Sequence, residues 1–317
     1  MTSTSWRSPG TRRVLVTGAA GFVGSRVVRA LAAQGCEVIA LVRPNGDRER
    51  LAELGAQVGI VEGDFHNPAD WEDQLGGLRP TGLVHLAWHA EPGNYRNHPG
   101  NLADLTASLR LFELAHAWGC ARYVGVGTCL EYATDRGYLS EDVPLAPRCL
   151  YASAKASLYL CAAAWARTTG AAFAWARLFY QFGPGEDPRR LVPAVVNALL
   201  SNRPVALTAG SQVRDYLHVD DVAAAIAQLA ISDATGPFNV GSGRPVRVRD
   251  VVDELENQIG RPGLIQYGEL ADANDDPPFI CANTDRLRAA TGWQSSRTLE
   301  EGLAETIAWW AAMSTEA

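Results

Sequence analysis

The chain has 317 residues, of which 47% are hydrophobic and 20% charged, and its formal net charge is −7. This balance is typical of a folded protein with one large or two moderate domains, and it excludes a disordered or fibrous chain. The negative charge argues against a dedicated binder of nucleic acid or acidic membranes. Lys155 is the only lysine, so the other 27 of the 28 basic residues are arginine. A codon bias explains that ratio, and a lysine that survives it points to a role that arginine cannot fill.

The sequence indicates neither a secretion signal nor a membrane span. The first eleven residues are polar and lack the apolar stretch of a signal peptide, and no apolar run reaches the ~18 residues of a membrane span. The six cysteines are scattered and show no C-x-x-C spacing. We therefore expect a cytoplasmic protein with reduced, packed thiols, with no metal site and no nucleic-acid or membrane partner.

Short apolar runs alternate with helical patterns over the first 179 residues. The strand-like runs are Val14–Thr17, Val38–Val42, Val58–Val61, Leu83–Ala87, Tyr123–Gly127 and Phe173–Leu178. The helical segments between them include Phe22–Gln34, Leu102–Trp118 and Ala152–Thr169. Continuous apolar strands that alternate with helices predict an α/β protein with a Rossmann-type, doubly wound parallel sheet.

The pattern changes after Tyr180, where glycine and proline residues at 183–185 break the chain. The helical segments that follow are Leu191–Ser201, Val219–Ile231, Val248–Ile259 and Leu299–Met313. We predict a dinucleotide-binding domain over residues 12–179 plus 218–240. Residues 180–217 plus 241–317 are predicted to form a smaller α/β substrate-binding domain.

A glycine-rich turn at residues 17–24 directly follows the first strand and opens the first helix. Glycines allow a tight turn and a close approach of the backbone to a pyrophosphate, and a helix N-terminus supplies unpaired N–H groups. In this context the turn predicts a dinucleotide site in preference to a purely structural turn. The residues expected at the cofactor here are Gly18, Gly21, Phe22, Val23 and Gly24.

The end of the second strand bears on which nicotinamide cofactor is bound. An acidic residue there would accept from a ribose 2′-hydroxyl, but this chain has Arg43, which pairs well with a 2′-phosphate. NADP(H) is therefore favoured, with Arg48 or Arg50 in support, and NAD(H) stays possible if Arg43 is only solvated. After the third strand, Asp64 either accepts from the adenine amino group, with Phe65 beside it, or caps the next helix.

Tyr151 and Lys155 are four residues apart on a predicted helix and therefore share one face. A nearby ammonium lowers the pKa of a phenol from its usual ~10, and a compact ammonium also bonds a ribose hydroxyl. Thr128 follows the strand Tyr123–Gly127 at the edge of the sheet where such folds bind ligands. We predict that Thr128, Tyr151 and Lys155 are catalytic, and that Tyr151 and Lys155 also contact the cofactor.

Segments spread over nearly the whole chain form one pattern. They are T-G-A-A-G-F-V-G at 17–24, L-V-H-L-A at 83–87, G-T-C-L-E-Y at 127–132, L-Y-A-S-A-K at 150–155, F-G-P-G-E at 182–186, V-R-D-Y-L-H-V-D-D-V-A at 213–223 and F-N-V-G-S-G at 238–243. Together they resemble the extended short-chain dehydrogenase/reductase family, in its nucleotide-sugar epimerase/dehydratase/reductase branch. The resemblance implies that Tyr151 is the acid/base, that Lys155 is its partner and binds the nicotinamide ribose, and that Thr128 is the family's Ser/Thr.

The resemblance also implies that the second domain binds a nucleoside-diphosphate sugar. Arg214 would hold the pyrophosphate, with Arg190 assisting unless it is only a surface charge. Trp88 and His89 depart from the pattern of epimerases, and they either line the sugar pocket or pack at the domain boundary. The other expected contacts are Leu86 and Ala87 at the cofactor, and Trp88, Thr128 and Tyr180 at the substrate. The residues expected to organise a turn and cap a helix are His218, Asp220 and Asp221.

Departures from the family pattern reduce the number of reactions that we expect this chain to catalyse. Family 4,6-dehydratases carry an Asp–Glu pair after the Thr, where this chain has Cys129 and Leu130, so a dehydratase is not expected. The main expectation is an NADPH-dependent reductase of a nucleotide-linked 4-keto-6-deoxy sugar, which Arg43 favours; the alternative is an NAD-dependent 4-epimerase. A non-catalytic NADP-binding sensor is less expected because the Tyr and the Lys are both present. We also expect a homodimer, since the family often pairs through the helices that follow Asn101 and Tyr151.

Overall fold

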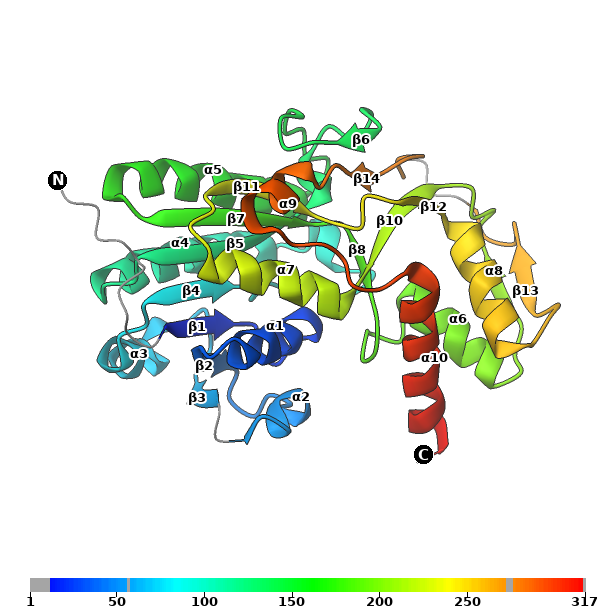
Figure 1. Cartoon of the computed structure of the whole chain (residues 1–317), viewed down its shortest axis with the longest axis horizontal. Helices are drawn as coiled ribbons and strands as arrows, with labels where there is room; N and C mark the ends of the chain where they lie inside the picture. The colour runs from blue at the N-terminus through cyan, green and yellow to red at the C-terminus, as the bar shows by residue number, and fades with distance from the viewer. Residues whose placement is uncertain (1–11, 56–57, 272–275, 316–317) are drawn as a thin grey trace.

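The centre of the fold is a seven-stranded parallel sheet in the order β11-β7-β5-β4-β1-β2-β3 (Figure 1). Its strands are β1 (Arg13–Thr17), β2 (Glu37–Val42), β3 (Val58–Glu62), β4 (Gly82–His85), β5 (Arg122–Thr128), β7 (Ala172–Leu178) and β11 (Gly236–Val240). The computed structural model describes residues 12–55, 58–271 and 276–315. Its sheet confirms the predicted Rossmann-type α/β class.

Helices cover both faces of this sheet. One face carries α1 (Phe22–Ala33), α2 (Glu49–Ala52) and α7 (Val219–Ile231), and the other carries α3 (Glu72–Leu78), α4 (Gly100–Ala117) and α5 (Leu150–Thr169). Along β1, Val14 and Val16 pack toward α1 and α7, while Leu15 packs on the opposite side. Because successive strand side chains point to opposite faces and both faces are covered, the strands read as continuous apolar runs.

Smaller sheets lie outside the large one, and all of their strands except β6 follow β7 in the chain. They pair β12 (Pro245–Arg247), β10 (Val213–His218) and β8 (Tyr180–Phe182), β13 (Ile265–Tyr267) with β9 (Val205–Leu207), and β14 (Cys281–Ala282) with β6 (Tyr138–Leu139). The helices here are α6 (Leu191–Leu200), α8 (Val248–Ile259) and α10 (Leu299–Thr315), whereas α9 (Asp285–Thr291) packs on β11 of the large sheet. Val195, Val252 and Leu303 lie in the separate apolar core of this part.

The chain returns to the large sheet after β10. Helix α7 packs against α1, and β11 pairs with the edge of β7. The two parts of the molecule are therefore interleaved in sequence, and β10 leads directly from the smaller sheet into α7.

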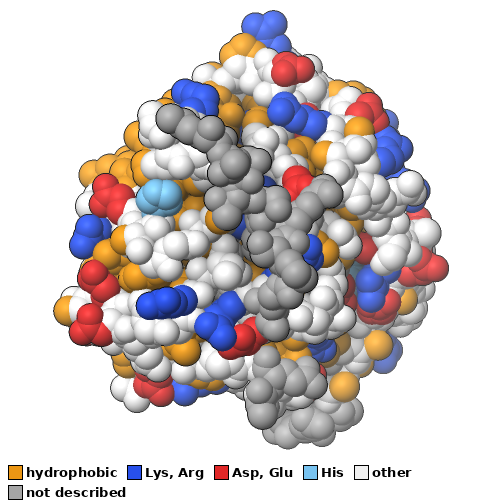
Figure 2. All heavy atoms as spheres, turned by 60° about the vertical axis from the view of Figure 1, so that its left-hand side comes forward, with side chains coloured by type: hydrophobic (Ala, Val, Ile, Leu, Met, Phe, Trp, Pro, Cys, Tyr) orange, Lys and Arg blue, Asp and Glu red, His pale blue; other side chains and the backbone are white. Residues whose placement is uncertain are grey.

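Acidic and basic side chains are interspersed on the face that Figure 2 shows. Among the described residues, no helix combines the length and the apolar character needed to cross a membrane.

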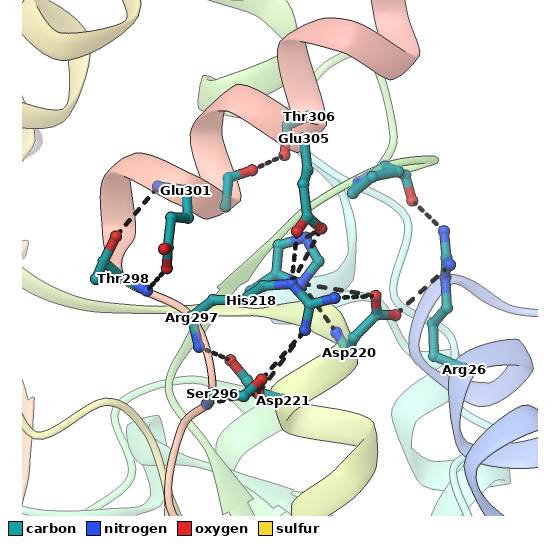
Figure 3. A network of polar contacts seen from close by, with 12 residues as sticks. Arg26, His218, Asp220, Asp221, Ser296, Arg297, Thr298, Glu301, Glu305 and Thr306 are labelled. Carbon is teal, nitrogen blue, oxygen red and sulfur yellow. Dashed lines mark hydrogen bonds and ion pairs between the residues drawn. The ribbon is translucent and has the colours of Figure 1, made fainter. Parts of the chain in front are cut away.

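A cluster of ion pairs joins α10 to α7 and α1 (Figure 3). The Arg297 guanidinium lies 2.9 Å from Glu305 Oε1 and 3.4 Å from Asp220 Oδ2. The guanidinium of Arg26 lies 3.5 Å from the other Asp220 oxygen. Two arginines thus balance the carboxylates that meet between the two parts of the molecule.

Of the three residues expected to organise a turn and cap α7, His218 does so, whereas Asp220 and Asp221 bind other segments. His218 Nδ1 accepts a hydrogen bond from the Asp220 N–H at 3.3 Å and caps the helix. Asp221 instead accepts from the backbone N–H and the hydroxyl of Ser296, at 3.0 and 2.6 Å, and so anchors the segment that leads into α10.

Candidate active site

The glycine-rich turn brings the start of α1 close to the end of β4. Gly18 has a φ of 68°, and a Cβ there would lie 2.8 Å from the backbone nitrogen of Ala87. A Cβ at Gly24 would lie 2.0 Å from the Gly18 carbonyl oxygen, so only glycine permits this approach. Gly21 donates its N–H to that carbonyl at 3.0 Å and precedes α1, whose first turn contains Phe22 and Val23. This open cradle at a helix N-terminus fits a dinucleotide pyrophosphate.

Arg43 and Asp64 lie together where an adenosine ribose would be recognised. Arg43 is exposed directly after β2. The backbone N–H of His66 and, to a smaller extent, Arg43 hold the pKa of Asp64 below its usual value. Asp64 Oδ1 accepts that N–H at 3.0 Å, so the carboxylate closes its own turn and does not cap the helix that follows. Phe65 is buried in the core beside it.

Arg48 and Arg50, expected as helpers of Arg43, are engaged elsewhere. Arg48 pairs with Glu62 at 2.5 Å. Arg50 donates to the Gly185 carbonyl at 2.9 Å and to the Ala20 carbonyl at 3.4 Å. Of the three arginines, Arg43 is the one whose charge acts on Asp64.

Thr128, Tyr151 and Lys155 converge at the carboxyl end of β5. Thr128 is the last residue of that strand, and Tyr151 and Lys155 lie in the first turns of α5. Lys155 is only 2% exposed, and its Nζ donates to the Val126 carbonyl at 2.8 Å. The sequence spacing thus places the three predicted catalytic side chains at one edge of the sheet.

Trp88 covers the predicted catalytic lysine. Lys155 Nζ lies 3.8 Å from the centroid of the Trp88 ring, within the range of a cation–π contact. The Tyr151 ring packs edge-on against the same indole at 6.3 Å. The indole N–H donates to Asn101 Oδ1 at 2.8 Å, which fixes its orientation. Trp88 therefore contacts both members of the Tyr–Lys pair, and Leu86 and Ala87 lead into it from β4.

Burial dominates the ionisation of the Tyr–Lys pair. It lowers the pKa of Lys155 to about 7, against the opposing effect of Glu131 and Asp104. It also raises the pKa of Tyr151, an effect that Tyr95 and Glu131 reinforce. The expectation that Lys155 lowers the pKa of the phenol is not met, because the ammonium is directed at Val126 and Trp88.

The arginines expected at the substrate diphosphate lie on the smaller part of the molecule. Arg190 immediately precedes α6, and its guanidinium carbon is 5.4 Å from the Tyr95 ring, which packs edge-on at 4.9 Å against Tyr151. Arg214 on β10 is 2% exposed, pairs with Asp276 at 2.6 Å and lies 5.4 Å from the Tyr180 ring. Arg190 thus lies beside Tyr95, which packs on Tyr151, and Arg214 lies beside Tyr180.

Residues 183–190, which we call the crossing loop, connect β8 to α6 and are fastened to the large domain. Arg26 and Arg50 donate to the carbonyls of Pro184 and Gly185, at 3.2 and 2.9 Å. At its other end the loop is held by Arg189, which pairs with Glu91 at 3.1 Å. The loop thus joins the smaller part to the glycine-rich turn and to the segment after β4.

Sequence reasoning missed Glu131, which is fully buried behind Thr128. Its Oε1 accepts the Thr128 N–H at 2.8 Å, and its Oε2 accepts from Arg177 at 2.7 Å and from the Trp175 indole at 3.1 Å. Thr128 and Glu131 form a capping box around the short helix Cys129–Glu131. The T-x-x-E spacing at 128–131 was the available signal.

The two residues after Thr128 carry no usable acid or base. Cys129 is 3% exposed, and burial raises the pKa of its thiol to about 12. Leu130 is apolar. The acid–base pair that a dehydratase places here is absent from this sequence.

The model of the NAD dependent epimerase/dehydratase family matches residues 14–241. The chain belongs to this family. The match spans the glycine-rich turn, the Tyr–Lys pair and Arg214, which are the features that carried the resemblance in the sequence.

The relatives of this epimerase/dehydratase chain act on nucleotide sugars according to their names. It is 27% identical to a probable UDP-glucuronate 4-epimerase of Rhizobium meliloti, over 94% of this chain and 96% of the relative. It is also 27% identical to a probable dTDP-glucose 4,6-dehydratase of Sinorhizobium fredii, over 94% and 92% of the two chains.

Two solved structures have the same fold. One is the UDP-glucose 4-epimerase of Thermotoga maritima with UDP-glucose, which is 25% identical with a TM-score of 0.84 over 95% of this chain and 99% of that chain. The other is DesIV, a dTDP-glucose 4,6-dehydratase of Streptomyces venezuelae with NAD and TYD bound, which is 27% identical with a TM-score of 0.84 over 95% and 97%. The 4-epimerase alternative has counterparts among these relatives, whereas the expected 4-ketoreductase and its NADP preference have none.

Proposed function

We propose that this protein is a nucleotide-sugar 4-epimerase that oxidises and then re-reduces C4 of its substrate with a retained NAD. The supporting observation is a Thr128–Tyr151–Lys155 site at the end of β5 whose next two residues, Cys129 and Leu130, supply no second acid–base pair. The 4-epimerases and 4,6-dehydratases named above share hydride transfer at C4, and the dehydratase needs an additional acid and base for elimination. A site without that pair is suited to C4 redox chemistry alone.

Each side chain has a defined task in this proposal. Bound in the glycine-rich cradle, NAD would supply the hydride acceptor and donor for C4. As a phenolate Tyr151 would accept the proton of the C4 hydroxyl during oxidation, and as a phenol it would return that proton during reduction, while the Thr128 hydroxyl would bond the same oxygen. Lys155, one helical turn from Tyr151, would bond the nicotinamide ribose, while Arg190 and Arg214 would hold the diphosphate.

The crossing loop favours a retained cofactor. Arg50 bonds a carbonyl of the glycine-rich turn and a carbonyl of the loop, so the loop is held beside the expected pyrophosphate site. An epimerase uses the same NAD in both half-reactions, and slow release of the cofactor suits it. A reductase must exchange its cofactor in every turnover.

An NADPH-dependent 4-ketoreductase is the second candidate, and Arg43 is the observation that favours it. The guanidinium lies at the end of β2 in the place of an acid that would bind a ribose diol. In that case Tyr151 donates a proton to the keto oxygen of a nucleotide-linked 4-keto-6-deoxy sugar.

The test separates these reactions by their products. The purified protein is denatured and the released nucleotide identified, and the native protein is then incubated with nucleotide-linked hexoses and 4-keto-6-deoxyhexoses. We expect released NAD and interconversion of C4 epimers without net change of added cofactor. Stoichiometric oxidation of NADPH would overturn the proposal in favour of the reductase, and the appearance of a 4-keto-6-deoxy product from a hexose would show a dehydratase.

We also propose that the protein forms a homodimer through α4 and α5. Leu102 on α4 and Leu160 on α5 are large apolar side chains that are 56% and 57% exposed. These two helices pack side by side on one face of the sheet, so their outer surfaces can form one continuous contact.

A further inference from the structure

Lys155 and Glu131 are buried charged side chains that both bond the backbone of β5 near its carboxyl end. Lys155 Nζ donates to the carbonyl of Val126, and Glu131 accepts the N–H of Thr128. These two backbone groups belong to residues two positions apart on β5, which is about 7 Å along a strand. Lys155 is 2% exposed and Glu131 is fully buried, so little water screens them from each other.

The contacts of Glu131 require a carboxylate. Its partners are the backbone N–H of Thr128, the indole N–H of Trp175 and the guanidinium of Arg177, and all three are donors. A protonated carboxyl would bring a fourth donor to a set that has no acceptor for it. Burial raises the pKa of Glu131, and Arg177 opposes this. The hydrogen-bond pattern therefore favours the charged form of Glu131.

The other titratable groups around Lys155 are Asp104, whose charge supports the ammonium less than that of Glu131, and two neutral side chains. Asp104 on α4 is bonded to His66 Nε2 at 2.8 Å and to the His89 N–H at 3.0 Å. Burial holds the pKa of His85 on β4 well below its ordinary value, so that ring is neutral. The phenol of Tyr151 on α5 is also neutral, because burial raises its pKa.

The strand is shaped to admit Glu131. A Cβ at residue 127 would lie 2.2 Å from Glu131 Oε1 and 2.3 Å from Trp175 Nε1. Gly127 is therefore necessary for the carboxylate and the indole to lie together under α5. Any larger residue at 127 would occupy the space in which the Glu131 carboxylate lies.

We propose that Glu131 is the counter-charge of Lys155, a positioning residue that keeps the buried lysine as an ammonium and holds the backbone of Thr128 in place. Arg177 takes part of the same negative charge, so the three groups form a cation–anion–cation arrangement behind the site. The importance of Glu131 for the reaction rests on the proposed function, but the pKa of Lys155 can be measured without an activity assay.

The single lysine makes the measurement direct. Protein labelled with carbon-13 lysine has one Cε signal, whose shift during a pH titration reports the pKa of Lys155. Removing a negative charge disfavours the ammonium, so Glu131→Gln is expected to move the midpoint from about 7 to a lower pH. For two unit charges about 7 Å apart, an effective dielectric of ~20 gives a shift of about 1–2 units, which sets the scale of the expected change.

Two variants make the result specific. Glu141→Gln removes another inward carboxylate, which accepts the Asn239 N–H at 2.8 Å, and it should leave the midpoint of Lys155 unchanged. Arg177→Gln should raise the midpoint, and adding Glu131→Gln to it should lower the midpoint again. This pair of variants keeps the test available if Glu131→Gln alone does not fold.

An unchanged Lys155 midpoint in folded Glu131→Gln, or in the double variant relative to Arg177→Gln, would overturn the role. An equal shift in Glu141→Gln would overturn it as well, because it would show a general response to lost burial. Failure of the C4 assays with the expected titration shifts would refute the proposed function and leave the counter-charge intact.

Discussion

A single methyl group at residue 127 tests the packing behind the site. In Gly127→Ala the new Cβ would lie 2.2 Å from Glu131 Oε1 and 2.3 Å from Trp175 Nε1, and neither group has space to retreat because both are fully buried. Gly59 on β3 provides the matched control. A Cβ there has its nearest neighbour at 3.7 Å, which is ordinary contact.

The size of the destabilisation depends on which groups the new methyl group displaces. Overpacking costs about 1–3 kcal/mol. If the methyl group separates Glu131 from Arg177, the unpaired buried charge costs about 3–5 kcal/mol instead. We therefore expect a loss of about 3–5 kcal/mol for Gly127→Ala, or roughly 4–8 °C in Tm for a chain of this size. The Thr128 N–H would lose its partner at the same time, so turnover should fall in the protein that remains folded.

The assay is thermal unfolding of the parent and the two variants, followed by circular dichroism under identical conditions. Gly59→Ala is expected within about 1 kcal/mol of the parent, since a strand accepts alanine at least as well as glycine. Equal Tm values for the two variants would refute the packing described for Glu131 and Trp175.

Three further predictions concern the site and the assembly. Tyr151→Phe should lower turnover by several orders of magnitude with cofactor binding unchanged in calorimetry, and full activity would remove the phenol from the mechanism. Arg50→Ala should speed cofactor release in stopped-flow measurements because it frees the crossing loop, whereas Arg48→Ala, which breaks only the surface pair with Glu62, should not. Leu160→Glu should yield a monomer in sedimentation at micromolar concentration if α4 and α5 form the dimer, and an unchanged dimer would exclude that face.

Much of the fold is visible in the sequence because its strongest signals are local. Helices at Val219–Ile231 and Val248–Ile259 were predicted to the residue, and the first helix ends one residue earlier than Gln34. Each begins after a strand or turn signal and carries a regular apolar face. The glycine-rich turn was equally legible, since its positions are set by backbone contacts within one short segment.

The elements that were missed depend on distant partners. The pair β9 and β13 has three residues in each strand, and β6 and β14 have two, so no periodicity can develop in them. Helix α3 contains Gly76 and Gly77, which weaken its local signal.

Within the site, the sequence predicted which side chains converge but not how they are charged. The i, i+4 spacing brought Tyr151 and Lys155 together, yet their pKa values follow burial by Trp88 and by elements distant in the chain. Glu131 meets Arg177 only because β5 and β7 are neighbours in the sheet. Spacing along the chain cannot report such contacts.

The interleaved order of the two parts also constrains the protein during its synthesis. When residue 180 leaves the ribosome, the apolar face of α1 and the edge of β7 have no cover, because α7 and β11 lie between residues 219 and 240. At usual translation rates the intervening 60 or so residues take about 3–12 s. For that interval the nascent chain exposes an unpaired strand edge and an uncovered helix, which is the kind of surface that chaperones bind. The first segment of the smaller part, which contains β8, α6 and β10, must therefore be made before the large sheet can be completed.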